Sequence, residues 1–308
     1  MNDLLDIFTN QDFYFAMLRS TTPVLLTTLG AIIASRSGAS NIALEGTMLA
    51  SAFMGVVVSA LTQNAWVGLF GAVLMGVIMS NILAYFALKL KSNIIISGIA
   101  LNLMASGGTV FGLYLLTGDK GASTSLNSLV LPSIEIPIIK DIPVIGGILS
   151  GHHILTYIGL ILVVAIWAMF KYTTLGMRIR AVGESPEAAE SVGISVNKMR
   201  YIALTLSGIL AALGGAFLSM GYVKLFSAGM TAGRGYVALA TQAMAAGNTI
   251  VGLFTSMLFG FSESLSNYLQ GFSLPIEFIQ MLPYLTIIII YVIYTARQSK
   301  KEEKKKID

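Results

Sequence analysis

Long apolar stretches recur along this chain at the length that a helix needs to cross a bilayer. About 20 residues in a helix span about 30 Å of hydrocarbon. We place such segments at residues 15–34, 43–62, 65–88, 94–117, 153–170, 201–222, 236–247, 249–270 and 276–296. The segment 236–247 is too short to cross unaided, so we expect it to be tilted, extended by its flanking turns, or re-entrant. The sequence therefore predicts an all-α polytopic membrane protein with about nine transmembrane helices, in a range of about eight to ten.

The composition agrees with this class. Of the 308 residues, 55% are hydrophobic and only 11% are charged, whereas a soluble domain carries about a quarter charged residues. So few charges cannot cover a water-exposed surface of this size. We expect one transmembrane domain over residues 1–308.

The basic residues predict how the chain sits in the membrane, because they favour cytoplasmic loops. One side would hold Arg36, Lys89, Lys91, Lys171, Arg178, Arg180, Lys198, Arg200 and the basic tail 297–308, and the other only Lys120, Lys140, Lys224 and Arg234. The first side is therefore predicted to be cytoplasmic, with the loop 171–200 on it. The loop 118–151 and the N-terminus would lie outside, and the C-terminus inside. A basic run directly after a span is typical of a cytoplasmic end, so no nucleic-acid partner is expected.

Small residues recur at every fourth position in three of the predicted spans. The three stripes are Gly68, Ala72, Gly76, Ser80 and Ala84; Ala203, Ser207, Ala211, Gly215 and Ser219; and Gly252, Ser256, Gly260 and Ser264. Residues four apart share a helix face, and small residues let helices approach closely in lipid. The stripes could be static packing surfaces or surfaces that slide during a conformational cycle.

Motifs for catalysis are missing from the sequence. It has no G-x-x-x-x-G-K-[ST] phosphate loop, so it is not expected to hydrolyse ATP by that route. It has no cysteine, which excludes disulfides and thiolate metal sites. The adjacent His152 and His153 would point about 100° apart on a helix and make a poor metal pair, so we expect them to cap a span. No catalytic residue, metal or cofactor is predicted, and the chain is not expected to be an enzyme.

The loop 171–200 contains a short helix with signals at both ends. Ser185 is a suitable N-cap and Pro186 suits the first helical position. Glu187 and Glu190 complement the positive helix N-terminus, and Gly193 can end the helix. A rigid, capped helix between two spans is well suited to dock into the groove of a partner protein.

The same segment resembles a known family. Glu187-Ala188-Ala189, followed by Gly193, looks like the EAA-type coupling loop of ABC importer permeases. Residues 180–189 are similar to permeases of the branched-chain amino acid, simple sugar and nucleoside group. Residues 36–46, 98–103, 229–240 and 281–284 fit the same group, especially its nucleoside-type members. The likeness runs from about residue 20 to 296, although the stretch before Asn248 lacks the basic-aromatic pair common in these permeases, and ten spans are common in the group.

The resemblance implies a permease subunit that translocates a nucleoside or a related sugar-bearing solute across the plasma membrane. It implies three partners: a cytoplasmic ABC ATPase, a second permease subunit in a heterodimer, and an extracytoplasmic substrate-binding protein. The residues implied to couple to the ATPase are Glu184, Pro186, Glu187, Ala188, Ala189 and Gly193.

Polar residues at membrane depth are costly unless satisfied, so they are candidates for the substrate path. They are Asn41, Glu45, Asn102, Gln242 and Glu263. Interhelical hydrogen bonding is the alternative for Asn102 and Gln242, and local capping is the alternative for Glu45. Residues 38–44 and 233–239 both place a glycine-rich break before a helix start, an arrangement that can flank a midplane binding site.

Two other functions are compatible with parts of the sequence. A secondary transporter could work without an ATPase, driven by protons or sodium through Glu45 or Glu263. A membrane scaffold or channel is a third possibility, which the capped helix in the loop 171–200 disfavours.

Overall fold

The computed structural model describes residues 10–137, 142, 145–271 and 275–307, with side chains up to residue 296. In these residues the chain is helical apart from loops and two isolated β-bridges. The elements are α2 (Gln11–Arg36), α3 (Leu44–Thr62), α4 (Ala65–Ala84), the π-helix η1 (Tyr85–Lys89), α5 (Ile94–Thr117), α7 (Ile145–Leu149), α8 (Ile154–Tyr172), α9 (Thr174–Glu184), α10 (Pro186–Ser191), α11 (Val196–Phe217), the π-helix η2 (Leu218–Tyr222), α12 (Arg234–Ala245), α13 (Thr249–Leu269) and α14 (Ile276–Ile307). The predicted all-α architecture is confirmed.

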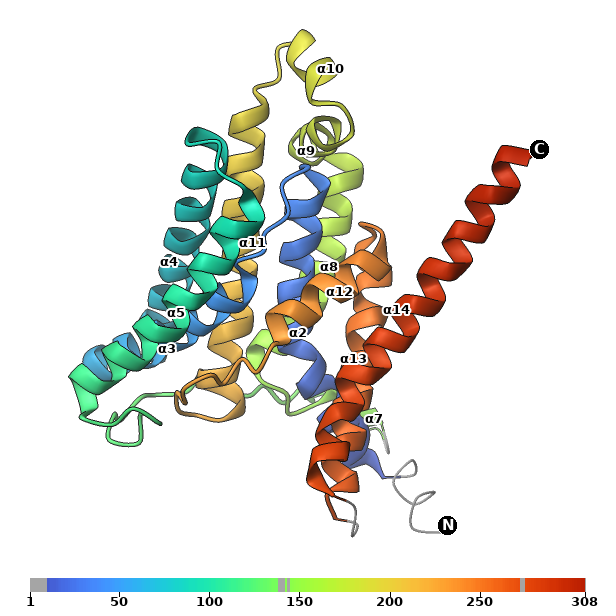
Figure 1. Cartoon of the computed structure of the whole chain (residues 1–308). Coiled ribbons are helices and arrows are strands. Elements are labelled where there is room, and N and C mark those ends of the chain that lie inside the picture. Colours follow the sequence, from blue (N-terminus) through green and yellow to red (C-terminus); the bar gives the residue numbers. More distant parts are fainter. Residues whose placement is uncertain (1–9, 138–141, 143–144, 272–274, 308) are drawn as a thin grey trace.

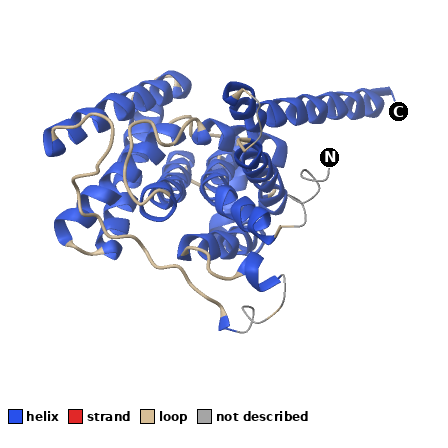
Figure 2. Cartoon of the chain, turned by 90° about the horizontal axis from the view of Figure 1, so that it is seen from below, coloured by secondary structure: helices blue, strands red, loops and turns tan. Residues whose placement is uncertain are grey.

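Most of the long helices run between two ends of one bundle (Figure 1). The helices α9 and α10 cap one end, which we call the α10 end. The described part of the loop 118–151 lies at the opposite end, which we call the loop end, and Figure 2 looks onto the long loops that cross it. There the Leu129 carbonyl accepts a hydrogen bond from Ser59 near the end of α3. The loop residues 138–141 and 143–144 lie outside the described residues.

Seven described helical segments are long and apolar enough to cross a membrane. They comprise α2, α3, α4 with η1, α5, α8, α11 with η2, and the first 21 residues of α14. The remaining two predicted spans are present as helices, but α12 has only 12 residues and the 21-residue α13 is not among the seven. The total of nine crossings therefore stays a prediction.

Local side-chain caps explain where several helices begin. Asn64, Asn93 and Asn248 each precede a helix, and each accepts hydrogen bonds from backbone N–H groups of the first turn. Such a cap satisfies donors that have no partner within the helix. His153 caps α8 in the same way through Nδ1, which accepts from the Leu155 N–H at 3.3 Å. The expectation that the two histidines cap a span is confirmed for His153 alone. His152 instead forms a hydrogen bond through Nε2 with the Ile148 carbonyl at 2.8 Å.

Helix α2 occupies the centre of the bundle, and nearly every side chain from Ser20 to Ala34 is buried. The small-residue stripes are among the surfaces that pack around it and between its neighbours. Gly260 on α13 lies against Thr21 of α2, and Gly76 on α4 lies against the Gly208 carbonyl of α11. A methyl group at either glycine would overlap its neighbour. The stripes are therefore close-packed helix contacts in this structure.

The helices α5 and α14 lie at the periphery and expose large apolar side chains along much of their length. Helix α14 is 32 residues long and runs from the loop end outward, away from the bundle (Figure 1). Phe278 and Ile288 are among its exposed apolar side chains. An extended apolar surface of this kind faces lipid or a partner subunit. The side chains of the predicted basic tail, from residue 297 onward, lie outside the described residues.

Candidate functional site

Helices α3 and α12 both begin inside the bundle, and their N-termini meet there. The loop that follows η2 returns from the loop end, and α12 starts between the two ends of the bundle (Figure 1). A methyl group on Gly235 would lie 2.5 Å from the Cα atom of Glu45, so the two backbones are in direct contact. We call residues 41–46 and 231–236 the junction. It joins the two glycine-rich breaks that the sequence suggested as flanks of one site.

The Glu45 side chain caps α12 across this contact. Its Oε1 accepts hydrogen bonds from the Thr231 hydroxyl at 2.6 Å and the Gly233 N–H at 2.8 Å. Its Oε2 accepts from the Gly235 N–H at 2.7 Å. A carboxylate stabilises the positive end of a helix and satisfies its free N–H groups. Glu45 therefore does cap a helix, but the helix is one that begins 189 residues later in the chain.

Two buried asparagines hold the start of α3. The Asn102 Oδ1 accepts from the Gly46 N–H at 2.8 Å, while its Nδ2 donates to the Ile42 carbonyl at 3.0 Å and the Tyr236 hydroxyl at 3.1 Å. The Asn41 Nδ2 donates to the Ser207 hydroxyl at 3.0 Å. Both side chains thus connect helices, as the hydrogen-bonding alternative for Asn102 required.

An ion pair joins Arg234, in the junction, to Glu263 on α13. Their side chains are 15% and 13% exposed, and Arg234 also donates to the carbonyls of Met230 and Thr231. The sequence assigned Arg234 to an external loop, and this was wrong: the residue is the first of α12, because the preceding loop turns back into the bundle. Burial of a charge is tolerated only when it is paired.

The ion pair borders a polar cavity of about 350 Å³. Its walls include Arg234, Glu263, Asn267, Gln270, Gln280 and Tyr284. A second cavity of about 270 Å³ is mostly apolar and is lined by Gly233, Tyr236, Val237, Ala240, Tyr284, Ile287 and Ile288. Tyr284 lines both, and its hydroxyl donates to the Ala232 carbonyl at 2.7 Å. Tyr284 on α14 therefore stands between the cavity beside Glu263 and the apolar cavity at the start of α12.

Sequence reasoning did not select Arg234, Tyr236 or Tyr284 as site residues. All three stand in stretches that carry the family resemblance, residues 229–240 and 281–284. The sequence did contain one signal for such a site: a basic residue and a tyrosine stand beside two glycines, directly ahead of an apolar helix. Their proximity depends on how α12 and α14 pack, and the sequence did not reveal that packing.

Gln242 lies apart from the junction, near the other end of α12. Its Nε2 donates to the Ser35 hydroxyl at 3.1 Å. It lines a cavity of about 270 Å³ at the α10 end together with Arg36, Arg180 and Glu184. The candidates Asn41, Glu45 and Asn102 thus converge at the junction with Glu263 nearby, whereas Gln242 does not.

The capped helix predicted in the loop 171–200 is α10. Its N-cap hydroxyl, on Ser185, accepts from the Ala188 N–H at 3.4 Å, and Pro186 occupies the first turn. Gly193, beyond the last turn, has a φ of +81°, a conformation that favours glycine. One side of the helix is buried, where Ala189 packs with Val182, Val196 and Met199. Glu184, Glu187 and Ala188 are exposed.

The sequence did not predict α9, which precedes α10 and connects it to the bundle. Gly183 of α9 packs against the Arg36 carbonyl at the end of α2, so closely that a methyl group would overlap it. Nearby, the Arg200 Nε donates to the Ser37 carbonyl at 3.3 Å. Residues 37–43 then continue to the junction. The segment 36–43 therefore contacts α9 and α11 at its start and leads to Glu45 at its end.

A polytopic helical bundle with discontinuous helices that meet in its interior, and a capped helix at one end, has the architecture of a membrane transport subunit. The family described as branched-chain amino acid transport system / permease component matches residues 13–291. The chain belongs to this family and is an ABC transporter permease.

Several curated relatives cover most of the chain. It is 33% identical to the putative glucose ABC transporter permease protein TsgC13 of Haloferax volcanii, over 85% of this chain and 79% of the relative. It is 31% identical to the nucleoside ABC transporter permease protein NupC of Lactococcus lactis, over 91% of both. It is 33% identical to the guanosine ABC transporter permease protein NupQ of Bacillus subtilis, over 89% of both.

Among solved structures, a chain of PsaBC from Streptococcus pneumoniae in complex with Fab has a similar fold. The TM-score is 0.50 with 17% sequence identity, and the match covers 95% of this chain and 93% of that one. At this identity the similarity concerns the fold alone.

Proposed function

We propose that this permease carries a nucleoside, or a related sugar-bearing solute, through an ABC importer. The observation that carries the proposal is the pair of cavities along α14, which combine amide, aromatic and apolar walls beside the junction. The nucleoside, guanosine and glucose substrates in the names of the relatives support the same class.

The chemistry of the walls suits a neutral, hydroxylated solute. The amides of Asn267, Gln270 and Gln280 can donate to and accept from sugar hydroxyls. Tyr236 and Tyr284 offer aromatic rings against which a planar base can pack. The charges of Arg234 and Glu263 neutralise each other, so neither sign of ion is favoured. We propose Asn41, Glu45 and Asn102 as the groups that shape the inner end of this path.

Coupling to ATP hydrolysis would use α10. We propose that a cytoplasmic ABC ATPase receives this helix in a groove and contacts its exposed surface at Glu184, Glu187 and Ala188. Closure of the ATPase would displace α9 and α10 together. Gly183 would transmit the displacement to residues 36–38 and from there to the junction.

This arrangement also assigns the two ends of the bundle. The α10 end would be cytoplasmic and the loop end extracytoplasmic, in the plasma membrane. The N-terminus would then lie outside, the C-terminus inside, and a substrate-binding protein would dock on the loop end. A second permease subunit, forming a heterodimer, would cover the apolar faces of α5 and α14 and close the cavities. ATP hydrolysis would belong to the separate ATPase.

An ion-coupled transporter without an ATPase has no support from the relatives, which are ABC transporter permeases. Glu45 and Glu263, the two carboxylates through which ions would be coupled, both have partners in the structure. Glu45 accepts three hydrogen bonds at the start of α12, and Glu263 is paired with Arg234.

The test is uptake of radiolabelled guanosine, ribose and glucose by a deletion strain that expresses the wild-type chain or Glu187→Arg. We expect saturable guanosine uptake with the wild-type chain, and loss of both uptake and ATPase co-purification with Glu187→Arg. Glu277→Arg is the matched control for co-purification, because Glu277 is an exposed acid at the loop end. Guanosine uptake that persists in Glu187→Arg without a bound ATPase would contradict the coupling proposal. Uptake of ribose or glucose without uptake of guanosine would identify that sugar, and not a nucleoside, as the substrate.

A further inference from the structure

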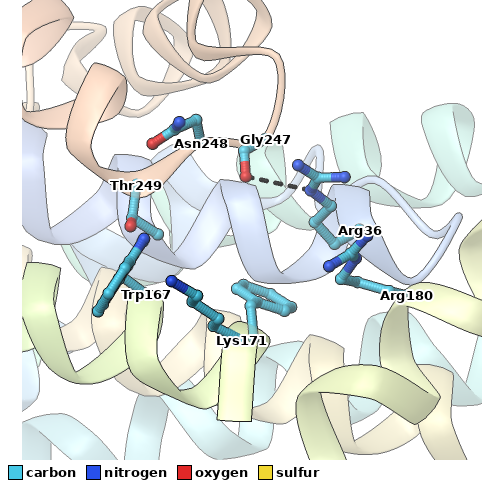
Figure 3. Close-up of a pocket in the computed structure, with 8 residues that line it drawn as sticks. Arg36, Trp167, Lys171, Arg180, Gly247, Asn248 and Thr249 are labelled. Carbon is cyan, nitrogen blue, oxygen red and sulfur yellow. Dashed lines mark hydrogen bonds between the residues drawn. The ribbon is translucent and has the colours of Figure 1, made fainter.

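At the α10 end, basic side chains from three different helices surround one cavity of about 270 Å³ (Figure 3). Arg36 comes from α2, Lys171 from α8 and Arg180 from α9. No acidic residue is among the described residues that line this cavity. The Arg180 guanidinium lies 3.7 Å from the Glu184 carboxylate, but Glu184 is 71% exposed and lines the adjacent cavity instead of this one. The cavity therefore carries a local excess of positive charge.

A buried hydroxyl without a partner lies in the wall of the same cavity. Thr249 is only 2% exposed, and its Oγ1 makes no hydrogen bond among the described residues. An unsatisfied buried hydroxyl costs free energy unless a ligand completes it. Thr249 is also the first residue of α13, and the N–H groups of Ile250 and Val251 that follow it are already capped by the Asn248 side chain. Three cations and an unpartnered hydroxyl together form a site for an anion with several acceptor oxygens, such as a phosphate group.

The helices that wall the cavity also carry exposed apolar rows that lead away from it. On α8, Ile161 and Val164 are 66% and 63% exposed and continue at helical spacing to Trp167 and Lys171. On α13, Ile250 and Phe254 follow Thr249, and Phe254 is 63% exposed. Tryptophan favours the headgroup level of a bilayer, and the Lys171 Nζ lies 4.8 Å from the centre of the Trp167 ring.

We propose that this cavity binds the phosphate headgroup of an anionic phospholipid, whose acyl chains lie along the exposed apolar rows of α8 and α13. Basic pockets between helices near a membrane surface are suited to such headgroups. A freely diffusing phosphate would find the same polar groups, but it would leave the two apolar rows unused. The lipid is therefore the source that the whole arrangement fits.

The site lies where several elements come together. The Arg36 Nε donates to the Gly247 carbonyl at 3.1 Å, in the turn between α12 and α13 (Figure 3). A bound phosphate would contact α2, α8, α9 and the start of α13 at once. Occupancy would therefore stabilise the α10 end as a unit, and the lipid would raise the melting temperature of the permease.

The test uses the purified full-length chain in an uncharged detergent, with phosphatidylglycerol, phosphatidylcholine or inorganic phosphate added in separate arms. We expect phosphatidylglycerol to raise Tm by about 5 °C at saturation, and the other two additives to give a much smaller shift. The double variant Lys171→Gln/Arg180→Gln should lose the phosphatidylglycerol shift. Arg178→Gln/Lys198→Gln makes the same charge change at exposed positions of α9 and α11 outside the cavity and should retain it.

Equal shifts with phosphatidylglycerol and phosphatidylcholine, or an unchanged shift in the double variant, would overturn the proposal. A full shift with inorganic phosphate would overturn the lipid as the source. If the double variant does not fold, Thr249→Val serves instead, because it removes only the unpartnered hydroxyl. Native mass spectrometry should then show several-fold less bound phosphatidylglycerol than for the wild type, and equal retention would count against the site.

Discussion

At the scale of single residues, the polar groups inside the bundle act mainly as connectors between helices. Glu45 joins α3 to α12, and Asn102 joins α5 to both of them. Each interaction replaces hydrogen bonds that water cannot supply at that depth. A residue that caps a helix can also border a transport path when the helix begins inside the bundle, because the cap then lies in the interior.

Glu45→Gln tests the cap. The amide offers one acceptor oxygen where the carboxylate offers two, so its NH₂ group must face either Gly235 or the pair Thr231 and Gly233, all of which donate to Glu45. An unmatched buried donor costs about 1–3 kcal/mol, and we expect a clearly lower Tm in thermal unfolding of the purified chain. Glu277→Gln, at an exposed position, should leave Tm unchanged. A Tm of Glu45→Gln equal to that of the wild type would show that the cap does not stabilise the junction.

The Arg234–Glu263 pair is tested by comparing single and double replacements. Either single change, Arg234→Gln or Glu263→Gln, leaves a largely buried charge without its partner, at a cost of about 3 kcal/mol. The double variant removes both charges and should be more stable than either single variant. Chemical denaturation of all four proteins measures this coupling. Additive effects of the two changes would mean that the ion pair contributes nothing.

At the scale of elements, the sequence located most helices because their boundaries depend on local signals. The predicted span 94–117 coincides with α5, and 43–62 differs from α3 by one residue, because the hydrophobic length of each span is visible in the sequence. For α5 the Asn93 cap lies directly before the span. The helix α10 was also predictable from Ser185, Pro186 and Gly193.

Features that depend on distant residues were not predictable in this way. The contact of Glu45 with Gly235 joins residues 190 positions apart. The glycine-rich breaks at 38–44 and 233–239 suggested that these two helix starts flank one site, but they did not reveal that Glu45 caps α12. Arg234 was misplaced because a loop that turns back into the bundle has the same composition as one that stays outside. The contact of α9 with the end of α2 was missed for the same reason, because it exists only after the helices pack.

Gly183→Ala tests the proposed link between α9 and the junction. The added methyl group overlaps the Arg36 carbonyl, so α9 must shift away from residues 36–38. Because α10 keeps its exposed surface, we expect ATPase co-purification to persist while guanosine uptake falls at least several-fold. The matched control is Gly159→Ala on α8, where an added methyl group would make only an ordinary contact, 3.5 Å from the Leu26 side chain. If Gly183→Ala transports as well as Gly159→Ala, this contact does not transmit coupling.

At the scale of the whole molecule, the arrangement of ends predicts which residues are reachable from outside the cell. The chain has no cysteine, so single cysteines can be introduced without background. Lys120 lies at the loop end and Glu187 on α10, and both are exposed.

In intact cells, a membrane-impermeant maleimide should label Lys120→Cys but not Glu187→Cys. Permeabilised cells should show labelling of both, which serves as the control for reactivity. The reverse pattern in intact cells would invert the orientation and would remove α10 from the reach of a cytoplasmic ATPase.

The glycine contacts between α4 and α11 have a consequence for how such a transporter can alternate its access. Gly76 and Gly208 lie backbone to backbone, and the Ser80 and Ala212 side chains border them on either side. Any translation along the helix axis would drive one of these side chains into the opposing main chain, so the two helices must travel as one body. The displacement that α9 is proposed to pass to residues 36–38 and the junction would then move other helices relative to this pair. The contact of α4 with α11 would stay intact through the cycle.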